Sequence, residues 1–145
     1  MNVKAIPSGY HSVTPYLTVH GAAELLEFLK DAFAATEKER IERPDGALGH
    51  AEVTIGDSVV MLGEVKGSCG PKPAALYLYL EDVDAAYRRA LEAGATSVME
   101  PTNQFWGDRQ GTVQDRFGNE WHLASRMENV SEEELKRRMA AIAKG

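Results

Sequence analysis

Two histidines stand in sequence contexts that could support chemistry. His50 and Glu52 lie two residues apart in "GHAEV", so on a β-strand both side chains face the same side of the sheet. Imidazole and carboxylate groups are ligands for divalent transition metals. With His122, from "NEWHL", they would form a His–Glu–His metal set if the fold brings the strands together. Alternatively, His50 and Glu52 hydrogen-bond each other or solvent on a half-exposed strand.

The same residues offer a chemistry without metal. Glu52 and His122 are the candidate catalytic acid and base, provided that a cavity shifts the pKa of each group. No nucleophile stands beside a base, because Ser58 follows Asp57 in a turn, where both residue types serve the backbone. The glycines of "PDGALG" and "IGDS" open no helix, so the sequence indicates no phosphate loop.

The segment "QFWGDRQGTVQDRFGNEWH", residues 104–122, is dense in unusual side chains. We expect Trp106 and Arg109 at the mouth of a cavity, where the guanidinium can hold an anionic ligand through a bidentate contact. The alternative is that each aspartate forms a weak ion pair with the arginine beside it in a turn, as Asp108–Arg109 and Asp115–Arg116.

Aromatic side chains favour a second kind of site, which binds a flat ligand and catalyses nothing. Stacking on an aromatic ring needs no metal. The alternative is that these rings pack in the core or at an interface. The candidate ligand-binding residues are Tyr16, Tyr77, Tyr79, Trp106 and Arg109, with Phe105 beside them.

Composition narrows the range of functions. The 145 residues are 43% hydrophobic, as in a globular domain with one core. The net charge of −6 argues against nucleic acid or an anionic membrane as partner, and no apolar run is long enough to span a bilayer. The N-terminus lacks the apolar segment of a secretory signal. The lone Cys69 fits a loop, so we expect a cytoplasmic protein.

Hydrophobic periodicity gives the first half of the chain a clear order of elements. Residues 12–19 alternate as a strand, and residues 21–35 have the apolar spacing of a helix with one buried face. Residues 36–64 contain the turn signals "RPDG" and "IGDS", which divide them into a meander of three strands.

The second half repeats this order, with a strand at 75–81 and a helix at 82–94 capped by Asp82. Three further strands follow, with turns at "GDRQ" and "FGNE". The predicted organisation is an N-terminal arm (1–11), a βαβββ module (12–64), a linker (65–74), a second βαβββ module (75–127) and a C-terminal helix (128–145). Because the C-terminal helix has a narrow apolar stripe, we expect it to pack on the domain or, alternatively, on a partner chain; the stripe is Val130, Leu135, Met139 and Ile142.

The first strand of each half has two unlike faces. Leu17 and Val19 suit a covering helix, whereas Tyr16 and Thr18 suit a concavity. The first strand of the second half, residues 75–81, has the same two faces. One face carries Leu76, Leu78 and Leu80, and the other carries Ala75, Tyr77 and Tyr79. We predict an α+β fold in which two such modules form a cupped mixed sheet around a ligand-sized hollow.

The stretches "TPYLTVHGAAELLEFLKDAF", "PDGALGHAEVTIGDSVVML" and "FWGDRQGTVQDRFGNEWHLA" resemble the PhnB-like branch of the vicinal oxygen chelate superfamily. This superfamily includes glyoxalase I, bleomycin-resistance proteins and extradiol dioxygenases. The resemblance covers about residues 12–127 and implies a homodimer. It does not select a reaction, since one scaffold carries isomerases, oxygenases, transferases and binding proteins.

The resemblance also implies where a divalent metal would bind. Catalytic members take their ligands from the first and last strand of each half, and these positions fall on Thr14, Met61, Ala75 and His122. Only His122 suits a transition metal, so we predict that the usual metal site is absent. We expect a protein that binds or sequesters a small, partly aromatic molecule without metal. The alternatives are a lyase, isomerase or dioxygenase using a displaced site at His50, Glu52 and His122, and a structural partner-binding domain.

Overall fold

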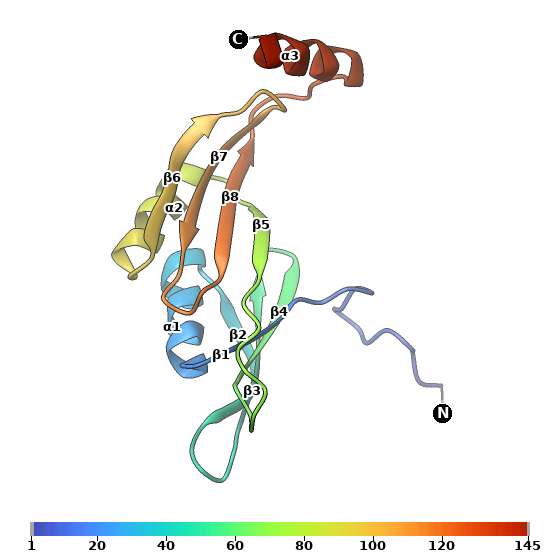
Figure 1. Ribbon diagram of the computed structural model, residues 1–145. Helices are drawn as coiled ribbons and strands as arrows, with labels where there is room; N and C mark the ends of the chain where they lie inside the picture. The colour runs from blue at the N-terminus through green and yellow to red at the C-terminus, as the bar shows by residue number, and fades with distance from the viewer. Residues whose placement is uncertain (1, 145) are drawn as a thin grey trace.

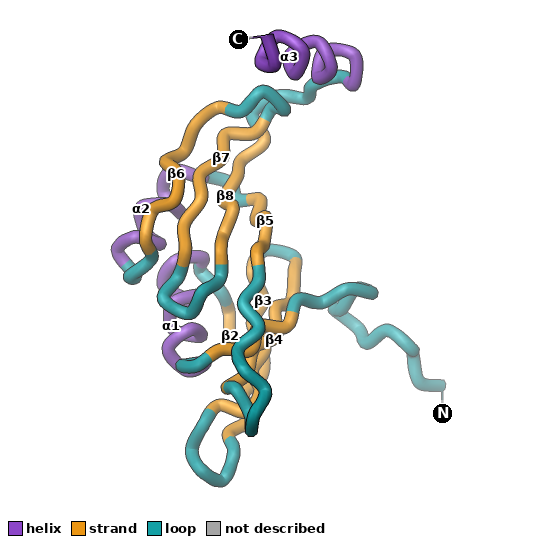
Figure 2. The backbone as a smooth tube through the Cα atoms, viewed as in Figure 1, coloured by secondary structure: helices purple, strands orange, loops and turns teal. Residues whose placement is uncertain are grey.

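The computed structural model describes residues 2–144, and it contains the same order of elements twice, followed by a third helix (Figures 1 and 2). The first module contains β1 (Tyr16–Val19), α1 (Ala22–Phe33), β2 (Thr36–Glu42), β3 (Leu48–Ile55) and β4 (Ser58–Glu64). The second contains β5 (Ala75–Tyr79), α2 (Val83–Glu92), β6 (Thr96–Asn103), β7 (Asp108–Gln114) and β8 (Glu120–Arg126). The chain ends in α3 (Glu132–Lys144). The predicted α+β fold of two βαβββ modules and a C-terminal helix is therefore confirmed.

The two modules have the same topology. Their sheets have the strand orders β1-β4-β3-β2 and β5-β8-β7-β6. In each sheet the first strand pairs in parallel with the last, and the other pairs are antiparallel. Within the described chain the eight strands form two separate four-stranded mixed sheets. These sheets lie one beyond the other, with both helices on the same side (Figure 1).

The core lies between the sheets and the two helices. Leu17 and Val19 are fully buried against the helix side, whereas Tyr16 on the opposite face is 49% exposed. This alternation is the predicted one. Phe33 of α1 lies against Trp121 of β8, with ring centroids 5.0 Å apart, so the core is continuous between the modules.

The first helix takes its N-terminal acceptor from another strand. Gly21 has a φ of 92° and no side chain to cap α1. The carboxylate of Glu64, at the end of β4, accepts hydrogen bonds from the backbone N–H groups of Gly21 and Ala22 at 3.0–3.1 Å. A carboxylate at this end also complements the helix dipole. Pairing β4 beside β1 thus stabilises the start of α1.

Two predicted boundaries are wrong. The first strand begins at Tyr16 rather than at residue 12, since Pro15 ahead of it has no N–H group to donate. The turn predicted at "GDRQ" lies earlier, at residues 104–107, because Gly107 takes the positive φ of 104°. Asp108 and Arg109 consequently belong to β7.

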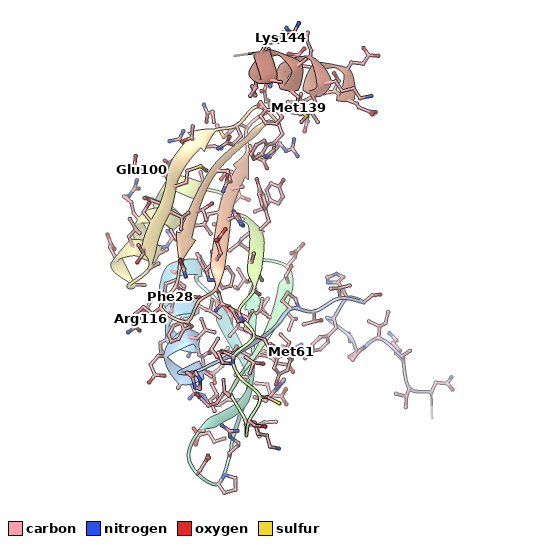
Figure 3. The ribbon with its side chains drawn as sticks, in the orientation of Figure 1. Phe28, Met61, Glu100, Arg116, Met139 and Lys144 are labelled. Atoms are coloured by element: carbon pink, nitrogen blue, oxygen red, sulfur yellow. The ribbon has the colours of Figure 1, made fainter. Side chains whose placement is uncertain are left out.

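The C-terminal helix does not pack on the domain as expected. No residue of α3 is buried, and Met139 and Ile142 of its apolar stripe are 55% and 58% exposed. The helix lies beyond the far end of the second sheet, where Figure 3 labels Met139. Arg138 connects it to the body by donating to the carbonyl of Phe105 at 3.0 Å and to Glu128 at 2.7 Å. Across residues 2–144, no helix combines the length and the apolar character that a membrane crossing requires.

Candidate functional site

The faces of the two sheets that point away from the helices carry related residues. Tyr16 on β1 is opposite Met61 on β4, and Tyr77 on β5 is opposite His122 on β8. We call these the open faces, because Tyr77 is 44% exposed and Tyr16 is slightly more exposed. Topology therefore gives each module one candidate surface of the same construction.

The open face of the second module has a buried acidic residue at the start of β7, where it pairs with Arg126 of β8. Asp108 is 1% exposed, and its Oδ2 atom accepts hydrogen bonds from the Tyr77 and Tyr79 hydroxyls at 2.7 and 2.8 Å. Trp106 Nε1 donates to the same oxygen at 3.0 Å. One carboxylate thus fixes three aromatic side chains, two from β5 and one from the turn before β7.

The charge of Asp108 controls the ionisation of its neighbours. Burial by itself raises the pKa of Asp108, but the three hydrogen bonds outweigh it and the pKa is lowered. Arg126 compensates the negative charge of Asp108, since its Nε lies 3.1 Å from Oδ1. Among the described residues, no N–H group is oriented to donate a hydrogen bond to Oδ1. Burial and the carboxylate together raise the pKa of Tyr77 to about 12. Both tyrosines remain neutral around Asp108 at ordinary pH.

His122 lies beside this aromatic cluster. Its ring stacks on Tyr77 with an interplanar angle of 17° and a centroid distance of 6.0 Å. Nδ1 lies 3.0 Å from the Thr112 hydroxyl, and Nε2 lies 3.0 Å from Glu120. Both ring nitrogens therefore have partners within the second module.

The open face of the first module has a different polar cluster. Glu52 on β3 is 5% exposed, and its Oε2 lies 2.8 Å from His50 Nε2. Tyr10, from the N-terminal arm, donates to the other oxygen of Glu52. Tyr16 lies 3.3 Å from His50 Nδ1. Glu52 and His50 lie on one face of the strand, as predicted from the sequence. Their contacts with Tyr10 and Tyr16 were not predicted.

The environment of Glu52 favours its ionised form. Burial raises the pKa of this carboxyl group, but the hydrogen bonds from His50 and Tyr10 leave the pKa below its ordinary value. Glu52 is thus a carboxylate at neutral pH. A general acid in the first module would need the opposite shift.

The four positions that the resemblance implies for a metal do not fit one. Met61 and Ala75 offer no suitable donor, and Thr14 offers only a neutral hydroxyl. Thr14 lies in the arm before β1 and lines a small crevice between the modules, of about 150 Å³, with His11. His122 is engaged by Glu120 and Thr112.

The displaced set of His50, Glu52 and His122 is not assembled either. Among residues 2–144, the acidic or histidine side chains whose ligand atoms all lie within 4.8 Å are Glu39, His50 and Glu52. His122 is on the other sheet, because the two modules form separate sheets. Glu39 was missed, because its pairing with Glu52 depends on a register shift between Ile41 and Glu42 that the turn signal does not reveal.

Arg109 does not lie at the mouth of a cavity. Its guanidinium forms a bidentate pair with Asp84 of α2 at 2.8 and 2.9 Å, on the face opposite to Asp108. The alternative of turn-local ion pairs is also wrong. Asp115 is buried and accepts hydrogen bonds from Trp121 Nε1 and from the Asn119 side chain. If "DRQGT" is taken as part of a strand, its alternation predicts that the side chains of Asp108 and Arg109 point to opposite faces of the sheet.

Comparison with known proteins agrees with this architecture. Residues 10–123 match the Glyoxalase/Bleomycin resistance protein/Dioxygenase superfamily. Uncharacterized proteins of Mycobacterium bovis and Mycobacterium tuberculosis are each 38% identical over 145 residues, covering 92% of this chain and 95% or 85% of the relative.

Solved structures share the fold at lower identity. TioX from Micromonospora sp. ML1 has a TM-score of 0.68 and 23% identity, covering 81% of this chain and 99% of that one. A PhnB protein from Bacillus cereus has a TM-score of 0.64 and 19% identity, with 79% and 99% covered. On the match over residues 10–123 and the paired βαβββ modules, the chain belongs to the glyoxalase/bleomycin resistance protein/dioxygenase superfamily.

Proposed function

We propose that this protein binds a small, partly aromatic molecule on the open face of the second module, without a metal at the positions that the resemblance implies. The Asp108 network is the observation that carries this proposal. Its hydrogen bonds fix the rings of Tyr77 and Tyr79, which nonetheless remain 44% and 56% exposed. A network serving only stability would be expected to fix buried rings. Rings that are already fixed lose little conformational entropy when a ligand stacks on them.

The hydrogen-bond donors of the network indicate which shape and polarity such a ligand has. Tyr77 and Tyr79 direct their hydroxyl hydrogens to Asp108, and Trp106 directs its N–H to the same carboxylate. The ring faces, rather than hydrogen-bond donors, are then the main binding surface. A flat molecule with an apolar face matches this surface.

A second copy of the chain is part of the proposal. Large apolar side chains are exposed on the sheets of both modules, and such surfaces are typical of association sites. They include Tyr16, Ile41, Tyr77, Tyr79 and Val98. A homodimer would cover part of these faces and enclose the ligand. Light scattering after size-exclusion chromatography measures this directly, and a monomer at all concentrations would contradict the dimer.

We also propose a cytoplasmic location, supported only by the single cysteine, Cys69. Catalysis by Glu52 and His122 is not proposed. The two residues lie on different sheets, and each is already paired with a neighbour.

Tryptophan fluorescence tests the ligand proposal. The protein has two tryptophans; Trp106 lies at the proposed site and Trp121 is buried at 1% exposure, so quenching reports mainly on Trp106. Titration with bleomycin and with small bicyclic aromatics such as quinoline should give saturable quenching for at least one probe. Tyr79→Ala should weaken that binding at least about tenfold.

Arg109→Gln is the matched control for this titration. Because Arg109 points to α2, the affinity should stay the same. Absence of saturable quenching with every probe, or equal affinities in Tyr79→Ala and the wild type, would overturn the proposal.

A further inference from the structure

We propose that Glu39, His50 and Glu52 bind one divalent transition-metal ion on the open face of the first module. The ligand atoms of these three side chains all lie within 4.8 Å of one another. Ligand atoms about 2.1 Å from a tetrahedral ion lie about 3.4 Å from one another, so binding would draw these side chains slightly closer together. This site shares no residue with the four metal positions implied by the resemblance, and it is separate from the proposed ligand surface around Tyr77.

The two carboxylates are placed where their charges repel. Glu39 and Glu52 are direct cross-strand partners on β2 and β3, and like charges in this relation destabilise a sheet. Glu52 is 5% exposed, so water screens its charge poorly. Among residues 2–144, no lysine or arginine forms an ion pair with either carboxylate. Lys30 and Arg40 pair with Glu37, and Lys38 lies over the ring of Tyr10, which donates to Glu52. A bound cation would supply the missing positive charge.

The imidazole is held in an orientation suitable for a ligand. Tyr16 engages His50 Nδ1 at 3.3 Å, which leaves Nε2 directed at the carboxylate of Glu52. Metal-binding histidines are usually oriented in this way through their other ring nitrogen. Gly63 leaves room for Tyr16, since a Cβ at residue 63 would lie 3.2 Å from the Tyr16 hydroxyl and 2.6 Å from the Gly49 carbonyl oxygen.

The site is open to small molecules on one side. A cavity of about 510 Å³ lies on the same face and is lined by His50, Tyr16, Gly63 and Cys69. Three protein ligands leave at least one coordination position of a metal ion for water or another oxygen ligand. That position can face this cavity.

The donor set indicates which ions fit. One imidazole nitrogen and two carboxylate oxygens suit Zn²⁺, Mn²⁺ or Co²⁺. Ca²⁺ prefers six to eight oxygen ligands, and Mg²⁺ prefers octahedral oxygen coordination with several waters. The site should therefore select first-row transition metals over both.

Titration of the metal-free, full-length protein with Zn²⁺ by calorimetry, and with Co²⁺ by absorption spectroscopy, tests the proposal. We expect one ion per chain. Glu39→Gln should weaken binding at least about tenfold, since even the loss of groups that only support metal ligands costs this much. Glu39 is exposed, so this variant should fold, which thermal unfolding without metal will verify. His50→Gln is the second variant and should behave alike.

His122→Gln is the matched control. His122 and Glu120 form the same kind of pair, two residues apart on β8 with 3.0 Å between their atoms, but among residues 2–144 no second carboxylate joins them. Binding should be unchanged in this variant and in Cys69→Ser, and Co²⁺ should show no thiolate charge-transfer band. Three results would each overturn the proposal: no bound ion, full affinity in Glu39→Gln, or loss of binding in His122→Gln or Cys69→Ser.

Discussion

The hydroxyl of Tyr77 donates a 2.7 Å hydrogen bond to the buried carboxylate of Asp108 across a sequence separation of 31 residues. The two residues stand on β5 and β7, which are not neighbours, since β8 lies between them. The bond therefore crosses one strand and ties the edge of the second sheet to its interior. The aromatic side chains of the open face depend on this connection for their orientation.

Asp108→Asn should destabilise the protein. The amide keeps one acceptor oxygen but loses the charge that compensates Arg126, and it presents an N–H₂ group where only acceptors are needed. We expect the free energy of unfolding to fall by about 1–3 kcal/mol, measured by urea denaturation. Asp31→Asn, at an exposed position of α1, is the control and should change it little. Equal stabilities of the two variants would show that the network contributes nothing.

Tyr77 should ionise well above the ordinary pKa of a tyrosine. Its pKa is raised from 10.0 to about 12, so the folded state disfavours the phenolate. The resulting contribution to stability is fully present below pH 10 and is lost as the pH rises from about 10 to about 12. Phenolate absorbance in an alkaline titration measures this. Tyr77→Phe should remove absorbance only from the most alkaline part of the curve; a loss centred near pH 10 would contradict the assigned environment.

Glu64→Ala should weaken the start of α1. The substitution removes the acceptor for the N–H groups of Gly21 and Ala22, and Gly21 has no side chain to replace it. Loss of an N-terminal acceptor costs about 0.5–2 kcal/mol. Chemical denaturation measures the change, and Glu92→Ala, at the exposed end of α2, serves as comparison. If both substitutions have the same effect, the capping role of Glu64 is wrong.

Arg109→Gln should have little effect on stability. The side chains of Arg109 and Asp84 are 31% and 40% exposed, and such pairs contribute about 0–1 kcal/mol. High salt should reduce even this difference between the variant and the wild type, since exposed ion pairs are screened. A loss well above this range that persists at high salt would mean that Arg109 has a packing role.

Short-range patterns in the sequence were enough to predict the two modules. The alternation of Leu17 and Val19 with Tyr16 placed one face against a helix, and Leu17 and Val19 are fully buried. Helix periodicity located α1 and α2 within one or two residues. These predictions succeeded because strand and helix periods are local properties of the chain, and burial follows from them. The placement of α3 failed, because an apolar stripe does not specify its partner.

The tertiary structure decided which polar side chains meet. The alternative in which Asp108 pairs with Arg109 beside it is wrong, because a strand sends neighbouring side chains to opposite faces, so Arg109 contacts α2 while Asp108 contacts β5. Glu39 joins His50 and Glu52 through the register of β2 on β3, which includes bulges that shift the pairing. Sequence determined each residue's type and its local face. Contacts across sheets, set by register and by the separation of the modules, determined the candidate sites.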